Sequence, residues 1–423
     1  MKTPKISRNK MLLTGLLVGL MMNVFPGCIL NGEGTIKGKV LDASGDAIEG
    51  ATVTTNPETT SATTDSSGIF IINNVSMGSY VVTATKSGTE SSEIFDVTFL
   101  ETFGCASSVA DIILKVNTTV SLSWEEKSAN GFIARGYGSS VVYQAKLYTF
   151  MGMDDTPGGG YNATGRKVQV YDPIGNTWTN LTDYPRSEGR YNAPAAEVNG
   201  MVYLFGGINV WGNYSTATVD KYNIATNAWT KDVATLPYQL GEKSVVIPYN
   251  GKVYIMGSRS YGGTVNKTVY AFNPSDNSFT AVTTFQNFRT HAVAVLVGDK
   301  IYIAGGYDIS YSTAMESYDI SDDIWTTLSP MPAGLHAAMG GVYNGIIYVI
   351  GGSDASGVLR EVYAYDIAGD SWEELQGTIW NARCSAFGDF IGNKYYLVGG
   401  YGGATGSDGY GIMIDKLEEG TFQ

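Results

Sequence analysis

The chain repeats one short pattern five times, and this repetition constrains its fold more than any other feature. An aromatic residue, a polar turn and a second aromatic residue seven positions later make up the pattern, as in YDIAGDSW from Tyr365 to Trp372. The other copies are YDPIGNTW from Tyr171, YNIATNAW from Tyr222, FNPSDNSF from Phe272 and YDISDDIW from Tyr318. A fixed period of this size, here 46 to 51 residues, is typical of arrays that stack one structural unit per repeat.

An apolar strand pattern that ends in glycine precedes each copy. These strands are VYLFGG, VYIMG, IYIAGG, IYVIGG and YYLVGG, which end at Gly207, Gly257, Gly306, Gly352 and Gly400, and LYTFMG, which ends at Gly152, is a degenerate first copy. Six copies of roughly 48 residues each carry enough strand pattern for six four-stranded sheets. Phe422 is a candidate for the second aromatic residue of a sixth motif. Alternatively, SLSWEE around Trp124 is the last strand of a sheet whose other strands lie at the end of the chain.

The glycine pairs, combined with the spaced tyrosine and tryptophan, resemble the kelch β-propeller family. The resemblance implies an all-β fold with six blades at residues 119–423. Residues 119–126 are a candidate for the closing strand, and closure by the N-terminal or the C-terminal strand stays open. The resemblance also assigns structural roles to Gly206, Gly207, Gly305, Gly306, Gly351, Gly352, Gly399 and Gly400, and to Trp178, Trp229, Trp325 and Trp372. Closure matters because it leaves only short, protected sheet edges.

Residues 34–115 predict a separate small β unit. GKVLDASGDAIEGATV alternates apolar and polar residues around a Gly-rich turn, and Phe70, Ile72, Tyr80 and Val82 keep period two in the strands that follow. This segment resembles the carboxypeptidase regulatory-like family, whose prealbumin-like β-sandwich has a carbohydrate-binding-like fold and is generally an accessory module without catalytic residues. The expected role is a spacer that precedes the propeller.

The first 28 residues predict export. Four basic residues precede an apolar run from Met11 to Val24, which is too short to span a bilayer. The run ends in FPGC, and Gly27–Cys28 resembles the lipobox of bacterial lipoproteins, in which the cysteine is acylated. We therefore expect residues 1–28 to be a signal peptide with lipidation at Cys28, and the protein to lie in the cell envelope, as an outer-membrane or surface lipoprotein or in the periplasm. Plain secretion and an uncleaved anchor remain alternatives.

Charge and composition exclude several functions. The net charge of −13 argues against a nucleic-acid partner, which needs a basic surface. His291 and His336 are the only histidines, and neither begins a zinc motif. Acidic pairs such as Asp154–Asp155 offer too few oxygens for calcium. We therefore expect no metal and no cofactor.

The most plausible site lies where loops gather on one face of the propeller. Loops leaving the second strand of each copy are rich in glycine, tyrosine, asparagine and serine, and the segments entering the first strand carry arginines and histidines. Aromatic rings with planar donors suit glycans or carboxylates. The candidate ligand-binding residues are Arg135, Arg186, Arg190, Trp211, Arg289, His291, His336, Trp380 and Arg383. The alternative is that the arginines pair with acidic residues of neighbouring blades.

These observations favour a binding function. We expect a monomeric recognition module that uses the loop face to bind a protein or a glycan. One alternative is an enzyme of the sugar-acid mutarotase type, for which Glu188, His291 and His336 are the only acid–base candidates. Another is a purely structural envelope protein.

Overall fold

The computed structural model describes residues 33–41, 47–56, 58–76, 79–85, 94–98, 107–108, 112–113, 122–154, 164–210, 214–405 and 411–422. The predicted signal peptide, Cys28 and Trp211 therefore lie outside the described residues. Among the residues described, the one helical element is the 3-10 turn η1 (Thr164–Arg166), and no helix is long and apolar enough to cross a membrane. The chain divides into two compact units, one with most of residues 1–114 and the other with residues 115–423. The predicted all-β fold class is confirmed.

The first unit is a β-sandwich. One sheet contains β1 (Glu33–Leu41), β4 (Ile69–Ser76), β7 (Ser107–Ser108) and β8 (Ile112–Ile113), and the other contains β2 (Thr52–Asn56), β3 (Ala62–Thr63), β5 (Ser79–Thr85) and β6 (Ile94–Thr98). Alternate side chains of both sheets, among them Ile36, Val53, Phe70 and Val82, form one fully buried core. The period-two pattern in the sequence has its physical origin here, because successive side chains of a strand point to opposite faces.

The second unit contains six four-stranded antiparallel sheets. Blade 1 has β10 (Ser139–Tyr143), β11 (Lys146–Phe150), β12 (Val168–Asp172) and β13 (Thr177–Asn180). Blade 2 has β15 (Ala195–Val198), β16 (Met201–Phe205), β18 (Thr216–Asn223) and β19 (Ala228–Leu240). Blade 3 has β20 (Val245–Tyr249), β21 (Lys252–Arg259), β22 (Val265–Asn273) and β23 (Ser278–Thr284).

The remaining blades follow the same order. Blade 4 has β24 (Val293–Val297), β25 (Lys300–Ala304), β26 (Met315–Asp319) and β27 (Ile324–Leu328). Blade 5 has β28 (Met339–Tyr343), β29 (Ile346–Ile350), β32 (Val362–Asp366) and β33 (Ser371–Glu374), and blade 6 has β34 (Phe387–Ile391), β35 (Lys394–Val398), β38 (Leu417–Phe422) and β9 (Leu122–Lys127). Short ribbons lie in three connections: β14 (Arg190–Tyr191) with β17 (Ile208–Asn209), β30 (Ser353–Asp354) with β31 (Gly357–Val358), and β36 (Tyr401–Thr405) with β37 (Gly411–Met413).

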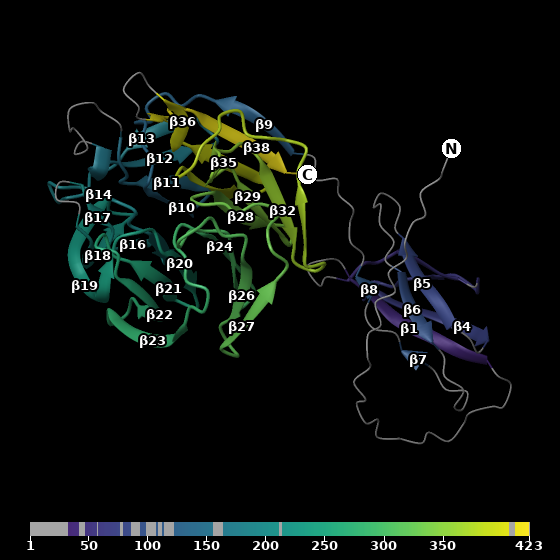
Figure 1. The fold of residues 1–423 in the computed structure, drawn as a ribbon. Coiled ribbons are helices and arrows are strands. Elements are labelled where there is room, and N and C mark those ends of the chain that lie inside the picture. Colours follow the sequence, from purple (N-terminus) through teal and green to yellow (C-terminus); the bar gives the residue numbers. More distant parts are fainter. Residues whose placement is uncertain are drawn as a thin grey trace, which may run out of the picture. The chain divides into compact units, whose positions relative to one another are not determined.

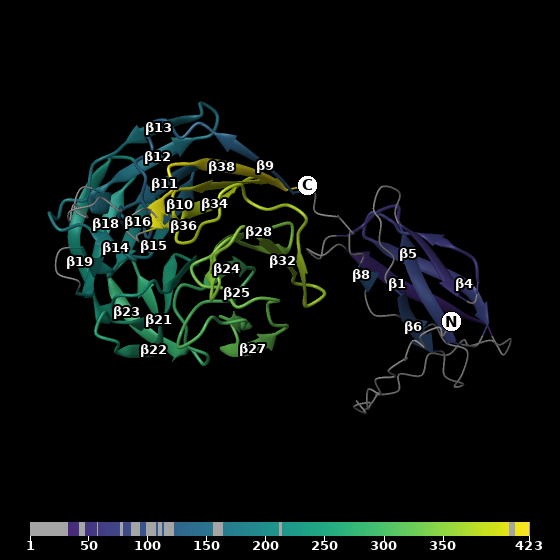
Figure 2. The same ribbon diagram turned by 45° about the horizontal axis from the view of Figure 1, so that its top comes forward.

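The six blades form a closed ring. Their first strands contact one another in the order β10, β15, β20, β24, β28 and β34, and β34 contacts β10 again. Figures 1 and 2 show these strands around the centre and fourth strands such as β13 and β27 at the periphery. The predicted six-bladed propeller is confirmed, with the first strands surrounding a central channel.

The repeated motif is the hairpin between the third and fourth strands of a blade. Tyr365 lies one residue before the end of β32, and its hydroxyl donates to Asp370 Oδ1 at 2.6 Å. Asp370 has a φ of 45°, in the left-handed region that asparagine and aspartate tolerate best. Tyr171, Tyr222 and Tyr318 repeat this bond to the residue five positions later. The motif therefore closes a turn, and its polar residues are used within the hairpin.

The second aromatic residue joins neighbouring blades. Trp372 Nε1 donates to the carbonyl of Ser329 at 2.8 Å, and Trp229 Nε1 donates to the carbonyl of Thr182 at 3.0 Å. Both acceptors lie just after the fourth strand of the preceding blade. Trp372 also packs against the buried cluster between blades 4 and 5. Each copy of the motif thus supplies one aromatic contact between blades, as the repeat pattern predicts.

The glycine pairs are required by backbone geometry. Gly351 and Gly352 have φ values of 60° and 97°, and the pairs at 206–207, 305–306 and 399–400 are also positive. A Cβ atom on Gly352 would lie 2.8 Å from the Cβ of Ala338. The pair therefore allows the chain to leave the second strand close to the segment that enters the first strand.

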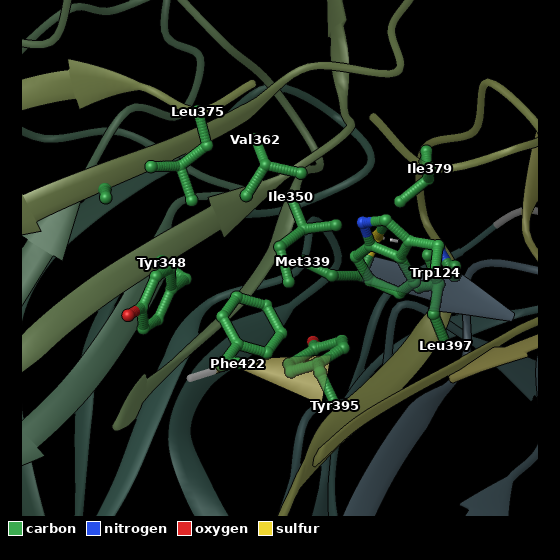
Figure 3. Packing of buried hydrophobic residues seen from close by; sticks show 12 residues of the cluster. Trp124, Met339, Tyr348, Ile350, Val362, Leu375, Ile379, Tyr395, Leu397 and Phe422 are labelled. Carbon is green, nitrogen blue, oxygen red and sulfur yellow. Dashed lines mark hydrogen bonds between the residues drawn. The ribbon is translucent and has the colours of Figure 1, made fainter. Parts of the chain in front are cut away.

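The sixth blade is completed by a strand from the start of the propeller. β9 pairs antiparallel with β38, with Trp124 opposite Gly420, just as Trp372 lies opposite Tyr365 in blade 5. The fourth-strand aromatic residue of blade 6 is thus Trp124. The prediction that Phe422 takes this position is wrong, because Phe422 lies on the third strand, with its ring centroid 4.5 Å from that of Tyr348 (Figure 3).

Candidate functional site

Four of the predicted ligand-binding arginines are buried inside the blades. Arg135, Arg190, Arg289 and Arg383 are each at most 2% exposed. Their guanidinium groups donate to the backbone carbonyl sixteen residues later, at the first position of the glycine pair or its equivalent. The acceptors are Met151, Gly206, Gly305 and Gly399, respectively.

The third strand of the same blade supplies the second partner of each arginine. Arg190 pairs with Asp220 at 3.0 Å, and Arg289 pairs with Glu316 at 2.5 Å. Arg383 pairs with Glu418, and Arg135 donates to the neutral Gln169 at 2.6 Å. The prediction that these arginines bind a ligand is therefore wrong, and so is the alternative that they pair across blades. They join three segments of one blade, and their donors are used there.

The remaining candidates lie closer to solvent. Arg186 is bound to Asp220 at 3.2 Å and Asp232 at 2.5 Å, and it also donates to the Tyr184 hydroxyl. Trp380 is 50% exposed, while its backbone N–H donates to Glu418. Arg186 is thus committed to carboxylates of its own blade, whereas the indole of Trp380 faces water on the loop face.

The two histidines meet each other at the mouth of the channel. The ring centroids of His291 and His336 are 4.7 Å apart, although they come from successive blades. Tyr307 and Tyr311, in the loop of blade 4 that follows the glycine pair, lie edge-on to His336 at 5.6 and 6.3 Å. Burial lowers the pKa of both histidines, and for His291 the neighbouring His336 and Lys243 lower it further. Both imidazoles are therefore neutral at pH 7.

A series of backbone hydrogen bonds runs along the mouth from blade to blade. The N–H of Asn192 donates to the carbonyl of Tyr137, that of Tyr137 to Ser385, that of Ser385 to Ala337, that of Ala337 to His291 and that of His291 to Lys243, at 2.7 to 3.0 Å. Tyr137, His291, Ala337 and Ser385 all have positive φ. Each blade thus places one residue at the same position around the opening, so six segments far apart in sequence define one rim.

Lys243 is the residue at this rim that sequence reasoning missed. Its ammonium donates to the carbonyl of Gly138, across the channel in blade 1, at 3.3 Å. Burial lowers the pKa of this lysine to about 8. Among the described residues, no carboxylate lies within 4.0 Å of the ammonium. Lys243 precedes the first strand of its blade as His291 does, so an alignment of the six entering segments could have identified it.

Two cavities meet at Lys243. The channel holds a cavity of 170 Å³, lined mostly by alanine, serine, glycine and valine from the first strands. A smaller cavity of 30 Å³ lies at the rim, between Tyr137, Asn192, His291 and Ser385. Lys243 lines both. Small side chains in the first strands leave this space open, and the rim adds one cation and several polar groups.

The structure does not bring the three acid–base candidates together at the channel mouth. Glu188, the proposed partner of the histidines in an enzyme, does not line either cavity. Its carboxylate instead accepts a hydrogen bond from Ser187 at 2.9 Å. Within the described part of the chain, no group of three or more His, Cys, Asp or Glu residues is placed to hold a metal ion.

The comparisons with known proteins agree with the architecture. Residues 156–409 match the model of the Attractin/LZTR1 beta-propeller, and residues 35–103 match that of the carboxypeptidase regulatory-like domain. The Kelch-like protein terF of Aspergillus terreus is 27% identical over 252 residues, which cover 55% of this chain and 53% of that protein. Mouse Kelch-like protein 35 is 24% identical over 54% of this chain and 38% of its own length. The chain thus spans about half or less of these relatives.

A solved structure shares the fold. The protein described as "Structure of YjhT" aligns with a TM-score of 0.57 and 18% identity, covering 69% of this chain and 98% of that one. At this identity the likeness concerns the fold alone. The family model covers more than half of the chain and lies within the six blades found above. The chain therefore belongs to the Attractin/LZTR1 beta-propeller family, with a carboxypeptidase regulatory-like domain ahead of its propeller.

Proposed function

We propose that this protein is an exported, lipid-anchored recognition module that binds a protein partner on the loop face of its propeller, with the channel mouth at the centre of the contact. The observation that carries this proposal is the rim itself. Lys243 and His291 line a cavity at the rim, His291 contacts His336, and Tyr307 and Tyr311 lie against His336. Aromatic and cationic side chains around a concavity are typical of binding surfaces.

The kelch-like relatives support a binding role over catalysis. The N-terminal sandwich fits this role as an accessory module, because its described core consists of apolar side chains that serve packing. The lipid anchor rests on Gly27–Cys28 after the apolar segment. A single acyl chain binds membranes only weakly, at about 0.8 kcal/mol for each buried methylene, so the several chains of a lipoprotein are needed for stable attachment.

The loop face can be tested by binding of the full chain to peptide and glycan arrays. Tyr311→Ala removes a ring that is 37% exposed at the rim, and it should reduce binding to the recognised partner at least fivefold. Ile174→Ala is the matched control, since Ile174 is 97% exposed in a hairpin between third and fourth strands, which antiparallel topology places on the opposite face. Equal binding by Tyr311→Ala and the wild type would contradict the proposed face. Binding to glycans and to no peptide would show that the partner is a glycan rather than a protein.

The anchor has its own test. Cys28→Ser removes the thiol that would be acylated, so the variant should move from the membrane fraction to the soluble fraction of the expressing cells. Retention of Cys28→Ser in the membrane after a carbonate wash would rule out lipidation as the anchor.

A further inference from the structure

The ammonium of Lys243 is the unusual group at the channel mouth. A cation removed from water is costly unless a counter-charge or several hydrogen bonds compensate for the lost hydration. Lys243 has three N–H donors, and one is used by the carbonyl of Gly138. The adjacent carboxylate of Glu242 is committed elsewhere, because it accepts from Thr290 Oγ1 at 2.7 Å and lies 3.9 Å from Arg259. Lys243 thus offers a positive charge and free donors to the cavity.

Two further polar groups at the same place lack partners. Asn192 lines the rim cavity and is 6% exposed, and its Oδ1 has no hydrogen-bond partner among the described residues. Ser244 lines the channel cavity and is 5% exposed, and its hydroxyl is likewise unpartnered within the described chain. Native proteins satisfy nearly all buried polar groups, so two unsatisfied groups in the two cavities that Lys243 lines point to a ligand.

The three groups specify the chemistry of that ligand. An ionised carboxylate only accepts hydrogen bonds, so it matches the ammonium of Lys243 and the hydroxyl of Ser244. The carbonyl oxygen of Asn192 needs a donor, such as an amide N–H. The last residue of a polypeptide carries a carboxylate and an amide N–H on the same Cα atom.

The size and lining of the channel fit this group. A cavity of about 150 Å³ holds a benzene ring, so the 170 Å³ cavity holds a group of about six or seven non-hydrogen atoms. Alanine, serine and glycine side chains around the channel leave this space open. A volume of this size holds the last residue of a polypeptide and no longer segment.

We propose that the channel mouth binds the C-terminal carboxylate of a protein partner. Lys243 is its counter-charge, Ser244 is a second donor to the carboxylate, and Asn192 accepts from the backbone N–H of the partner's last residue. This inference rests on the proposed recognition function and names the group that is recognised. The protein carries a net charge of −13, so long-range attraction does not favour an acidic ligand. Preference for a carboxylate must therefore arise from local contacts at the mouth.

The test compares one short peptide ending in glycine with its C-terminal amide, by calorimetry on the full chain. The free acid should bind at least tenfold more tightly than the amide, which corresponds to 1.4 kcal/mol. Lys243→Met should abolish this difference without lowering the melting temperature, since it removes a buried charge. Lys252→Met is the control, because Lys252 lies in the same blade and is exposed. Asn192→Ala should weaken both peptides equally.

Several outcomes would overturn the proposal. Equal binding of acid and amide, binding of neither at millimolar concentration, or an acid preference that survives Lys243→Met would each rule out Lys243 as a carboxylate anchor. Acetate that binds as tightly as the peptide acid would show a general carboxylate site, with no role for the backbone N–H of the last residue. In each case, a partner whose binding is still weakened by Tyr311→Ala would leave the proposed recognition function intact. Failure of this inference is therefore distinguishable from failure of the proposed function.

Discussion

Replacement of Arg289 by alanine should destabilise the propeller rather than abolish ligand binding. Arg289 and Glu316 are 2% and 3% exposed, and their charged groups are 2.5 Å apart. The guanidinium also donates to the carbonyls of Gly305, Asn287 and Ile303, at 2.6 to 2.9 Å. Removing one partner of a buried pair costs about 3–5 kcal/mol, because the other charge remains buried without compensation.

Urea unfolding monitored by tryptophan fluorescence can measure this loss. All seven tryptophans lie at or after residue 124, so the signal reports on the propeller unit. We expect Arg289→Ala to lower the free energy of unfolding by about 3–5 kcal/mol. The control Arg360→Ala removes an exposed arginine and should change it by about 0.5 kcal/mol at most.

A double variant separates charge from packing. Arg289→Met with Glu316→Leu removes both charges while keeping apolar volume, and should recover most of the stability lost in Arg289→Ala. The reasoning would be refuted if Arg289→Ala lost less than about 1 kcal/mol, as an exposed ion pair does, and at the same time failed to bind the partner. Arg289 would then act at the ligand and not inside the blade.

Three further predictions concern the packing between blades and the channel mouth. Trp372→Ala should cost about 3–5 kcal/mol in the same unfolding assay, through lost packing between blades 4 and 5; a loss below about 1 kcal/mol would contradict the role of the motif. Because the folded-state pKa of His291 and His336 is depressed, the unfolded chain takes up protons first, so stability should fall as pH drops below about 6.5. His291→Asn should flatten that dependence, and an unchanged slope would contradict the assignment. Binding of the peptide acid should weaken as pH rises through about 8, where Lys243 loses its proton while both histidines are already neutral; binding independent of pH between 7 and 9.5 would argue against an ion pair at Lys243.

The repeat pattern was sufficient to predict the fold, because its information is local and is written six times. Tyr365 and Trp372 face each other across a hairpin, and Gly351 and Gly352 need positive φ, so each requirement involves residues that are close in sequence. The strands and turns that one copy predicts therefore apply to the other copies as well. The exception was Phe422, because the last blade borrows its fourth strand from residues 122–127. That pairing depends on where the ring closes, which no single repeat encodes.

The candidate site was predicted only in part. The loop face and both histidines were identified from the sequence, but the role of the arginines was not. A buried arginine and a solvent-facing arginine look the same in an entering segment. What distinguishes them is the acidic partner on the third strand, which for Arg190 lies thirty residues further along at Asp220. Spacing between repeats cannot show which way such a side chain turns.

By itself, the sequence determined the class of fold, the number of blades and the residues that close each hairpin, since these follow from backbone conformation and side-chain alternation within a repeat. Only the tertiary structure decided what the mouth of the channel contains. Lys243, His291 and His336 come from three blades, and closure of the ring brings them to one opening. Their proximity results from the ring geometry, so the charge, the unsatisfied polar groups and the cavity they share become apparent only after the blades have closed.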